Sequence, residues 1–192
     1  LEWPATADGQ YARNYLLPIM NDPQKYISNV HSTQLMIAKV DDVIIPITLT
    51  DFHAENTYTV SPYSHYVSYG GFEEVKHLNN PPVEALIKLI MNPVAWYFKR
   101  AELDKVVYVN NYLLSTNLYP SVNSEQLSAL SEALPVWFPD RVIVFRSVDQ
   151  RKNPHIYQAL EKKNYEMVLS RQVWYMDPAE AMRTRQYKED MR

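Results

Sequence analysis

Two arginines are the residues of this chain best suited to bind an anion. Arg146 directly follows a short apolar run, and Arg171 lies inside a second one nearer the end of the chain. Both runs are typical of central strands, beside which an unpaired charge is expensive. The arginines could therefore clamp a carboxylate or phosphate of a ligand, or they could form structural ion pairs with Asp149 or Glu166. The sequence leaves both interpretations open.

The histidines and serines lack the spacing of familiar catalytic or metal sites. There is no His-Glu-x-x-His pattern and no Gly-x-Ser-x-Gly turn, and with no cysteine the chain has no thiolate ligands. We therefore predict no metal site, and surface or core positions for the five histidines, which are His31, His53, His65, His77 and His155. Of these, His65 would act as a base only if it lay in a cleft.

The composition is that of an ordinary globular domain. The 192 residues are 46% hydrophobic and 21% charged, with a formal net charge of -3. This length supports one buried core, no apolar run reaches the ~20 residues of a membrane span, and no excess of basic residues suits a polyanion. We expect a soluble, cytoplasmic protein without a membrane or nucleic-acid partner, able to take a small-molecule ligand. Its three glycines exclude a glycine-rich phosphate loop.

The first half of the chain predicts a helical start followed by antiparallel strands. Proline and glycine punctuate this half, and β-branched runs alternate with polar turns. The expected elements are one or two brief helices between Asp8 and Asn29, a hairpin of Thr33–Val40 and Val43–Thr50, strands at Thr57–Val60 and His65–Tyr69, and a helix that opens at Pro81 and ends or kinks at Pro93.

The second half predicts an alternation of strands and helices. The expected elements are a strand over Lys105–Leu114, a helix capped by Ser124 that stops near Pro135, a strand within Arg141–Arg146, a helix over Asn153–Lys163 and a closing strand over Glu166–Tyr175. The wholly apolar run before Arg146 favours a place in the middle of the sheet. The predicted fold is therefore α/β, a central mixed sheet whose antiparallel meander is followed by strand-helix-strand-helix-strand.

A fixed series of positions follows the strand that precedes Arg146. In order these positions hold Val142–Phe145, Asn153, Ile156, Ala159-Leu160, Glu161-Lys162 and Asn164-Tyr165. Without a gap, they resemble the carboxyl-terminal signature of the GNAT superfamily of N-acyltransferases, where Asn, Ala, Leu-Tyr, Glu-Lys and Gly-Phe follow an apolar strand. Asn164 suits the place of the glycine because asparagine tolerates the left-handed conformation at a helix end.

The resemblance implies an acyl-coenzyme A donor, with two departures at the expected site. The family's Gly-x-Gly/Ala turn would fall between Leu114 and Gln126, which hold no glycine. Leu160 replaces the tyrosine that commonly protonates the departing thiolate, and leucine does no acid–base chemistry. The acid would then be Tyr157 or Tyr119, and the residues nearest the cofactor would be Leu114, Ser115, Thr116 and Asn153.

The resemblance leaves two functional hypotheses. The chain is a GNAT-like N-acyltransferase, or the fold-bearing half of one, that moves an acyl group from a thioester to an amine. Alternatively it is a non-catalytic GNAT-like domain that shapes the substrate site of a second such domain in the same protein. We expect a single domain over residues 1–178, followed by a helical linker over 179–192 that leads into further sequence.

Overall fold

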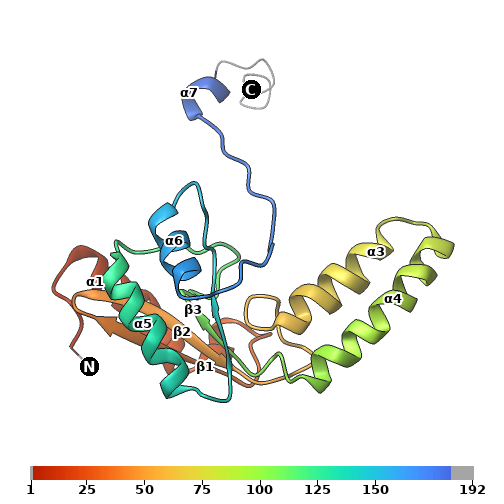
Figure 1. Ribbon diagram of the computed structural model, residues 1–192, viewed down its shortest axis with the longest axis horizontal. Coiled ribbons are helices and arrows are strands. Elements are labelled where there is room, and N and C mark those ends of the chain that lie inside the picture. Colours follow the sequence, from red (N-terminus) through yellow and green to blue (C-terminus); the bar gives the residue numbers. More distant parts are fainter. Residues whose placement is uncertain (1, 183–192) are drawn as a thin grey trace.

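An open four-stranded mixed sheet organises the structure, a computed structural model that describes residues 2–182 (Figure 1). β1 (Thr33–Val40) and β2 (Val43–Thr50) are antiparallel, β3 (Val106–Val109) runs antiparallel to β2, and β4 (Val142–Phe145) runs parallel to β3. The strand order is β1-β2-β3-β4. The mixed α/β class and the predicted hairpin are therefore confirmed.

Helices lie on both faces of this sheet and beyond it. In chain order the helices of the described residues are α1 (Ala7–Asn21), α2 (Pro23–Tyr26), the π-helical segment η1 (Ser64–Glu73), α3 (Glu74–Lys76), α4 (Pro81–Arg100), α5 (Ser124–Trp137), α6 (Pro154–Lys162) and α7 (Pro178–Ala181). α1 packs on one face, and α5 and α6 pack on the other. Figure 1 shows η1 and α3 pairing with α4 as a helical hairpin that projects from the sheet. None of the helices in the described residues is long and apolar enough to cross a membrane.

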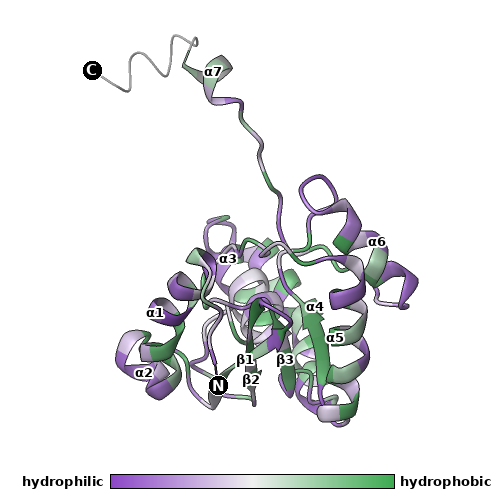
Figure 2. Ribbon diagram, turned by 90° about the vertical axis from the view of Figure 1, so that its left-hand side faces the viewer, coloured by the Kyte–Doolittle hydropathy of each residue, from purple (hydrophilic) through white to green (hydrophobic). Residues whose placement is uncertain are grey.

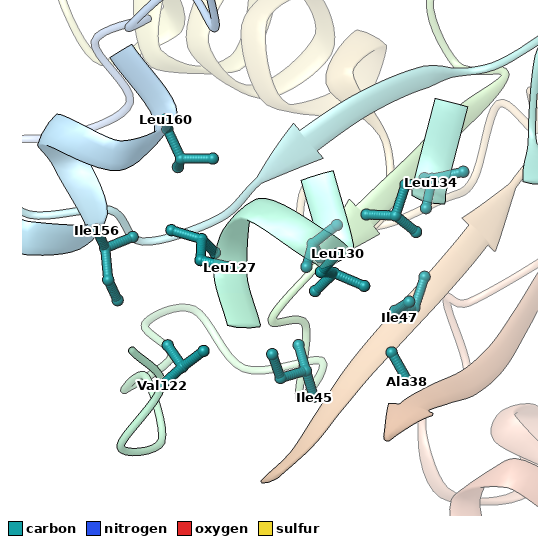
Figure 3. Close-up of a cluster of buried hydrophobic side chains, with 11 residues drawn as sticks. Ala38, Ile45, Ile47, Val122, Leu127, Leu130, Leu134, Ile156 and Leu160 are labelled. Carbon is teal, nitrogen blue, oxygen red and sulfur yellow. The ribbon is translucent and has the colours of Figure 1, made fainter. Parts of the chain in front are cut away.

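Alternation along β2 divides the core into two clusters. Ile45 and Ile47 face α5 and α6, where they pack with Leu127, Leu130, Leu134, Ile156 and Leu160 (Figure 3). Ile44, one residue out of phase, faces the opposite side and packs with Leu16 of α1. Successive strand residues point to opposite faces, so a strand apolar at every position is buried on both sides.

The predicted strands at Thr57–Val60 and His65–Tyr69 are wrong. Thr57–Val60 forms turns, and His65–Tyr69 lies inside η1. Gly71 of η1 packs close to α4, since a Cβ at this position would lie 2.4 Å from Met91 Cε. Glycine at this position lets η1 pack closely against α4, which the local strand propensity of the neighbouring tyrosines cannot reveal.

Proline stops fewer helices than the sequence predicts. α4 continues through Pro93, and α5 continues through Pro135 to Trp137. The cap of α5 also differs, because Asn123 rather than Ser124 accepts from the backbone of Gln126 and forms a capping box with it. Two helices are present near the start, but only α2 is brief, because α1 continues through Pro18 for 15 residues.

The carboxyl-terminal strands differ most from expectation. β4 lies at one edge of the sheet rather than in the middle, and Val142 is 42% exposed. The strand predicted over Lys105–Leu114 covers only Val106–Val109, since the chain turns at Asn110 with φ of 60°. Within the described residues, Glu166–Tyr175 forms no strand and runs as a largely exposed segment toward α7 (Figure 2).

The contacts just before Glu166–Tyr175 explain why this segment does not pair with β4. The chain reverses at Asn164, which has φ of 61°, and the Tyr165 ring packs edge-on against Phe145 at 5.2 Å between ring centroids. The Tyr165 hydroxyl donates to the carbonyl of Ser131 on α5 at 3.3 Å. The segment that follows lies beside η1 and the loop after β3 rather than along β4. Of the predicted linker, α7 covers only its start, and residues 183–192 lie outside the described residues.

Truncating Leu134 should destabilise the fold strongly. Its side chain is fully buried between α5 and β2, so Leu134→Ala should lower the free energy of unfolding by about 2–5 kcal/mol through lost burial and a cavity. Leu118→Ala is the matched control because Leu118 is 84% exposed, and its effect should stay within about 0.5 kcal/mol. Urea denaturation measures both, and equal losses would contradict this description of the core.

Candidate anion-binding site

The pleat of β3 and β4 places a tyrosine and an arginine on the same face of the sheet. Tyr108 pairs with Thr48 of β2 and with Val144 of β4. Arg146 continues the pairing beyond β4, because its N–H donates to the Val109 carbonyl at 3.0 Å. Residues two apart share a face, so Arg146 lies on the side of Tyr108 and Thr48, away from α5 and α6.

Arg146 is a buried cation without a carboxylate. Only 9% of the residue is exposed, and its Nη1 donates to Asn111 Oδ1 and to the Leu114 carbonyl. Its guanidinium carbon lies 5.4 Å from the centroid of the Tyr108 ring. Burial lowers the pKa of Arg146. Among residues 2–182 no ion pair involves Arg146, so its charge is stabilised only by carbonyl dipoles and a π-face.

In the described part of the chain, the two arginines do not form the structural ion pairs with Asp149 or Glu166 that the sequence allowed. Asp149 accepts instead from the backbone N–H groups of Arg151 and Lys152 and from the Tyr175 hydroxyl, and these bonds lower its pKa. Arg171 likewise forms no ion pair with Glu166 there. Within residues 2–182, neither Asp149 nor Glu166 neutralises these two arginines.

Asn111 holds the arginine in place through a fully used side chain. Its Nδ2 donates to Thr48 Oγ1 at 2.8 Å and to the Thr59 carbonyl at 2.9 Å. Its Oδ1 accepts from Arg146 and from the N–H of Leu113 at 3.0 Å. A buried amide with both donors and both acceptor positions satisfied has one orientation. Asn111 therefore fixes the guanidinium against β2 and the loop after it.

The loop after β3 brings predicted cofactor residues beside both arginines. Arg171 Nη1 donates to Thr116 Oγ1 at 2.9 Å, as Arg146 does to the Leu114 carbonyl at 3.3 Å. Leu114, Ser115 and Thr116 are all exposed. Asn153 lies at the N-cap position of α6, where its side chain does not cap the helix. No hydrogen bond in the described residues joins this side chain to the cluster.

His65 on η1 completes the polar cluster. Burial lowers its pKa, and the nearby charges of Arg171 and Arg146 lower it further against the opposing bond to Ser170. The ring Nε2 lies 3.3 Å from the Ser170 carbonyl, and a carbonyl only accepts, so Nε2 carries the proton. Nδ1 of neutral His65 then keeps a free lone pair, as a general base requires.

A buried carboxylate anchors the start of η1. Asp104, just before β3, accepts from Ser61 Oγ at 2.6 Å and from the N–H of Tyr63 at 2.7 Å. Ser61 Oγ in turn accepts from the N–H of Ser64 at 2.9 Å. Burial raises the pKa of Asp104, although these bonds oppose the shift. The network positions η1, and with it His65, over the face that carries Tyr108.

Two polar side chains near the cluster lack partners. The amide of Asn110 and the hydroxyl of Tyr119 are buried, and neither has a hydrogen-bond partner within the described residues. Burial raises the pKa of Tyr119, while Arg146 opposes the shift, so its phenol stays protonated at neutral pH. Tyr157 is half-buried on α6, and its side chain makes no hydrogen bond in the described part of the chain. Tyr119 is therefore the better placed of the two predicted acids.

Sequence reasoning missed three contributors to this cluster. Asn110, Asn111 and Tyr108 were not selected, although two consecutive asparagines directly after an apolar strand were a usable signal, because buried amides need specific partners. Two surface hollows of the described residues lie elsewhere. One of about 410 Å³ is lined by α5, β4 and Tyr165, and one of about 550 Å³ lies beside Arg151 and Tyr175.

Comparison with known proteins gives no identification. No protein-family model, curated protein or solved structure matches the chain. The functional argument therefore rests on the geometry of the site and on the sequence pattern.

Removing His65 should change the pH dependence of stability. Because the folded-state pKa of His65 lies below its ordinary value of 6.5, the unfolded chain takes up a proton first as the pH falls. Stability should therefore decrease below about pH 6.5, and His65→Gln should flatten that decrease. Urea unfolding across this range measures the slope. His77→Gln, at an exposed position, should keep the wild-type slope, and an unchanged slope in His65→Gln would contradict the assignment.

Proposed function

We propose that this chain is a GNAT-like domain that binds an acidic ligand and transfers an acyl group from a thioester to an amine. The observation that carries the proposal is the buried Arg146, which forms no ion pair among the described residues where β3 and β4 end. A buried cation costs free energy unless it is compensated. A carboxylate or phosphate of the ligand would supply that compensation, and Arg171 would share it.

The order of elements supports the GNAT-like part of the proposal. An antiparallel meander of β1, β2 and β3 precedes α5, the parallel strand β4 and then α6. In this arrangement the carboxyl ends of the two parallel strands lie side by side, and ligands of α/β sheets commonly bind at such ends. Arg146 occupies this place, and Leu114, predicted to lie near the cofactor, is hydrogen-bonded to it.

Two side chains would carry the chemistry. Nδ1 of His65 would take the proton of the attacking amine, since its lowered pKa leaves the ring neutral. The Tyr119 phenol would protonate the thiolate that leaves when the carbon–sulfur bond breaks, because it has no hydrogen-bond partner in the described structure. Arg146 and Arg171 would hold the acidic part of the donor.

The second candidate function is a non-catalytic domain that packs against another GNAT-like domain. The uncovered edge of β4 favours it, because an edge strand offers unpaired backbone groups to a further strand. Leu160 favours it too, since this side chain is only 1% exposed and packs in the core instead of reaching a ligand. A partner domain would then supply the catalytic acid.

Titration calorimetry with acetyl-coenzyme A tests ligand binding. We expect micromolar affinity for the wild type and a loss of about 10- to 100-fold in Arg146→Gln or Arg171→Gln, the range for a lost charge-assisted hydrogen bond. Arg100→Gln is the matched control, because Arg100 is exposed on α4, and it should bind as the wild type does. The absence of heat at millimolar ligand would remove acyl-coenzyme A as the donor.

Thiol release in the presence of amine acceptors separates the two candidate functions. If the domain is catalytic, His65→Gln should lower kcat by about 10²- to 10⁴-fold while the affinity for acetyl-coenzyme A is kept. Tyr119→Phe should lower kcat as well, and Tyr157→Phe should leave it unchanged. Binding without any thiol release by the wild type would support the non-catalytic function instead.

A further inference from the structure

We propose that His31, His53 and Glu55 form a binding site for a divalent transition-metal ion such as Zn²⁺. One ligand atom from each side chain lies within 4.8 Å of the other two. His31 precedes β1, whereas His53 and Glu55 follow β2. The hairpin brings these two ends together, since Thr33 pairs with Thr50. Two imidazoles and one carboxylate are a donor set that Zn²⁺ accepts, with water in the fourth position.

The three side chains are nearly arranged for a common ion. His31 Nε2 lies 3.7 Å from Glu55 Oε2. The rings of His31 and His53 stack with centroids 4.3 Å apart and planes 28° from parallel. A metal binds in the plane of each ring, so one ring must rotate about its Cβ–Cγ bond to direct its lone pair at the ion. Both histidines are only partly buried, so this rotation leaves the core unchanged.

The backbone that carries these ligands is fixed by a buried asparagine. Asn56 is 5% exposed, and its Oδ1 accepts from the N–H of His31 at 2.6 Å. Its Nδ2 donates to the Asp51 carbonyl at 3.3 Å. The N–H of Thr57 also donates to the Asn29 carbonyl at 2.8 Å. The two loops are therefore joined before any ion binds, which lowers the entropy cost of binding.

The other nitrogen of His31 has a partner of the kind that orients metal ligands. The side-chain amide of Gln24 on α2 lies 3.3 Å from His31 Nδ1. The atom that faces Nδ1 in the structure is the amide nitrogen, Gln24 Nε2. When Zn²⁺ binds His31 Nε2, a 180° turn of this amide would let its oxygen accept from Nδ1–H and hold the ring in place. The N–H of Glu55 approaches His53 Nδ1 at a similar 3.3 Å. Both contacts are long and therefore weak hydrogen bonds, so little hydrogen-bond energy is lost if a metal displaces them.

Titration calorimetry with Zn²⁺ on the whole chain tests the proposal. We expect one site of micromolar affinity in the wild type, and at least a tenfold loss of affinity in each of His31→Gln, His53→Gln and Glu55→Gln. His77→Gln is the matched control because His77 is exposed at the end of α3, and it should bind as the wild type does. Cobalt(II) bound at the same site should show the visible absorption of tetrahedral coordination.

Two results would overturn the proposal. One is a wild type that binds no Zn²⁺ at hundreds of micromolar, and the other is binding that none of the three substitutions weakens. Thermal unfolding without metal checks that each variant folds. Glu55 is the safest of the three positions because its side chain is 76% exposed, so Glu55→Gln keeps the test decisive if a histidine variant unfolds. Arg146→Gln should leave Zn²⁺ affinity unchanged, which separates this site from the proposed anion site.

Discussion

The side chain of Asn111 is the constraint on which the rest of the structure depends. It joins β2, the loop after β2 and the residue that follows β4 through Thr48, Thr59 and Arg146. Its own N–H donates to the Pro46 carbonyl at 3.1 Å. Because the amide is fully buried and all its hydrogen-bonding positions are used, moving any of these segments would leave a buried polar atom unsatisfied. One residue thus couples the meander to the parallel strand.

This constraint also determines where the sheet can be functional. The face toward α5 and α6 is filled mainly by aliphatic side chains such as Ile47 and Leu130, and Tyr119 packs at the border of this cluster. The other face holds Arg146, Tyr108 and His65 beneath η1. Native structures leave few buried polar groups unpaired, and departures from this rule cluster at functional sites. Among the described residues, the buried amide of Asn110 has no hydrogen-bond partner and Arg146 forms no ion pair, and the proposed ligand site rests on these two features.

The two proposed sites use the same hairpin for different purposes. The pairing of β1 with β2 brings His31 close to His53 and Glu55, where an ion would join the two ends of the hairpin. The pairing of β2 with β3 places Thr48 beside Tyr108, on the face that the anion would approach. Both proposals depend on strand register, since a shift by one residue would turn every side chain to the opposite face.

The sequence by itself determined the elements whose signal is local. The hairpin of Thr33–Val40 and Val43–Thr50 and the buried stripe of α5 follow from residue periodicity, which a short window reveals. Composition alone also excluded disulfides and a glycine-rich phosphate loop. Arg146 and Arg171 stand out in the sequence as charges beside apolar runs, although β4 lies at the sheet edge and the run around Arg171 forms no strand.

Only the tertiary structure decided the position of β4, the helical form of η1 and the members of both sites. The contacts responsible join residues far apart in the chain, since Ser61 and Asp104 are 43 positions apart and His65 and Ser170 are 105 apart. Local propensity contains no information about such pairs. His31 and His53 show the same limit, because they are 22 positions apart in the chain and only the strand pairing brings them together.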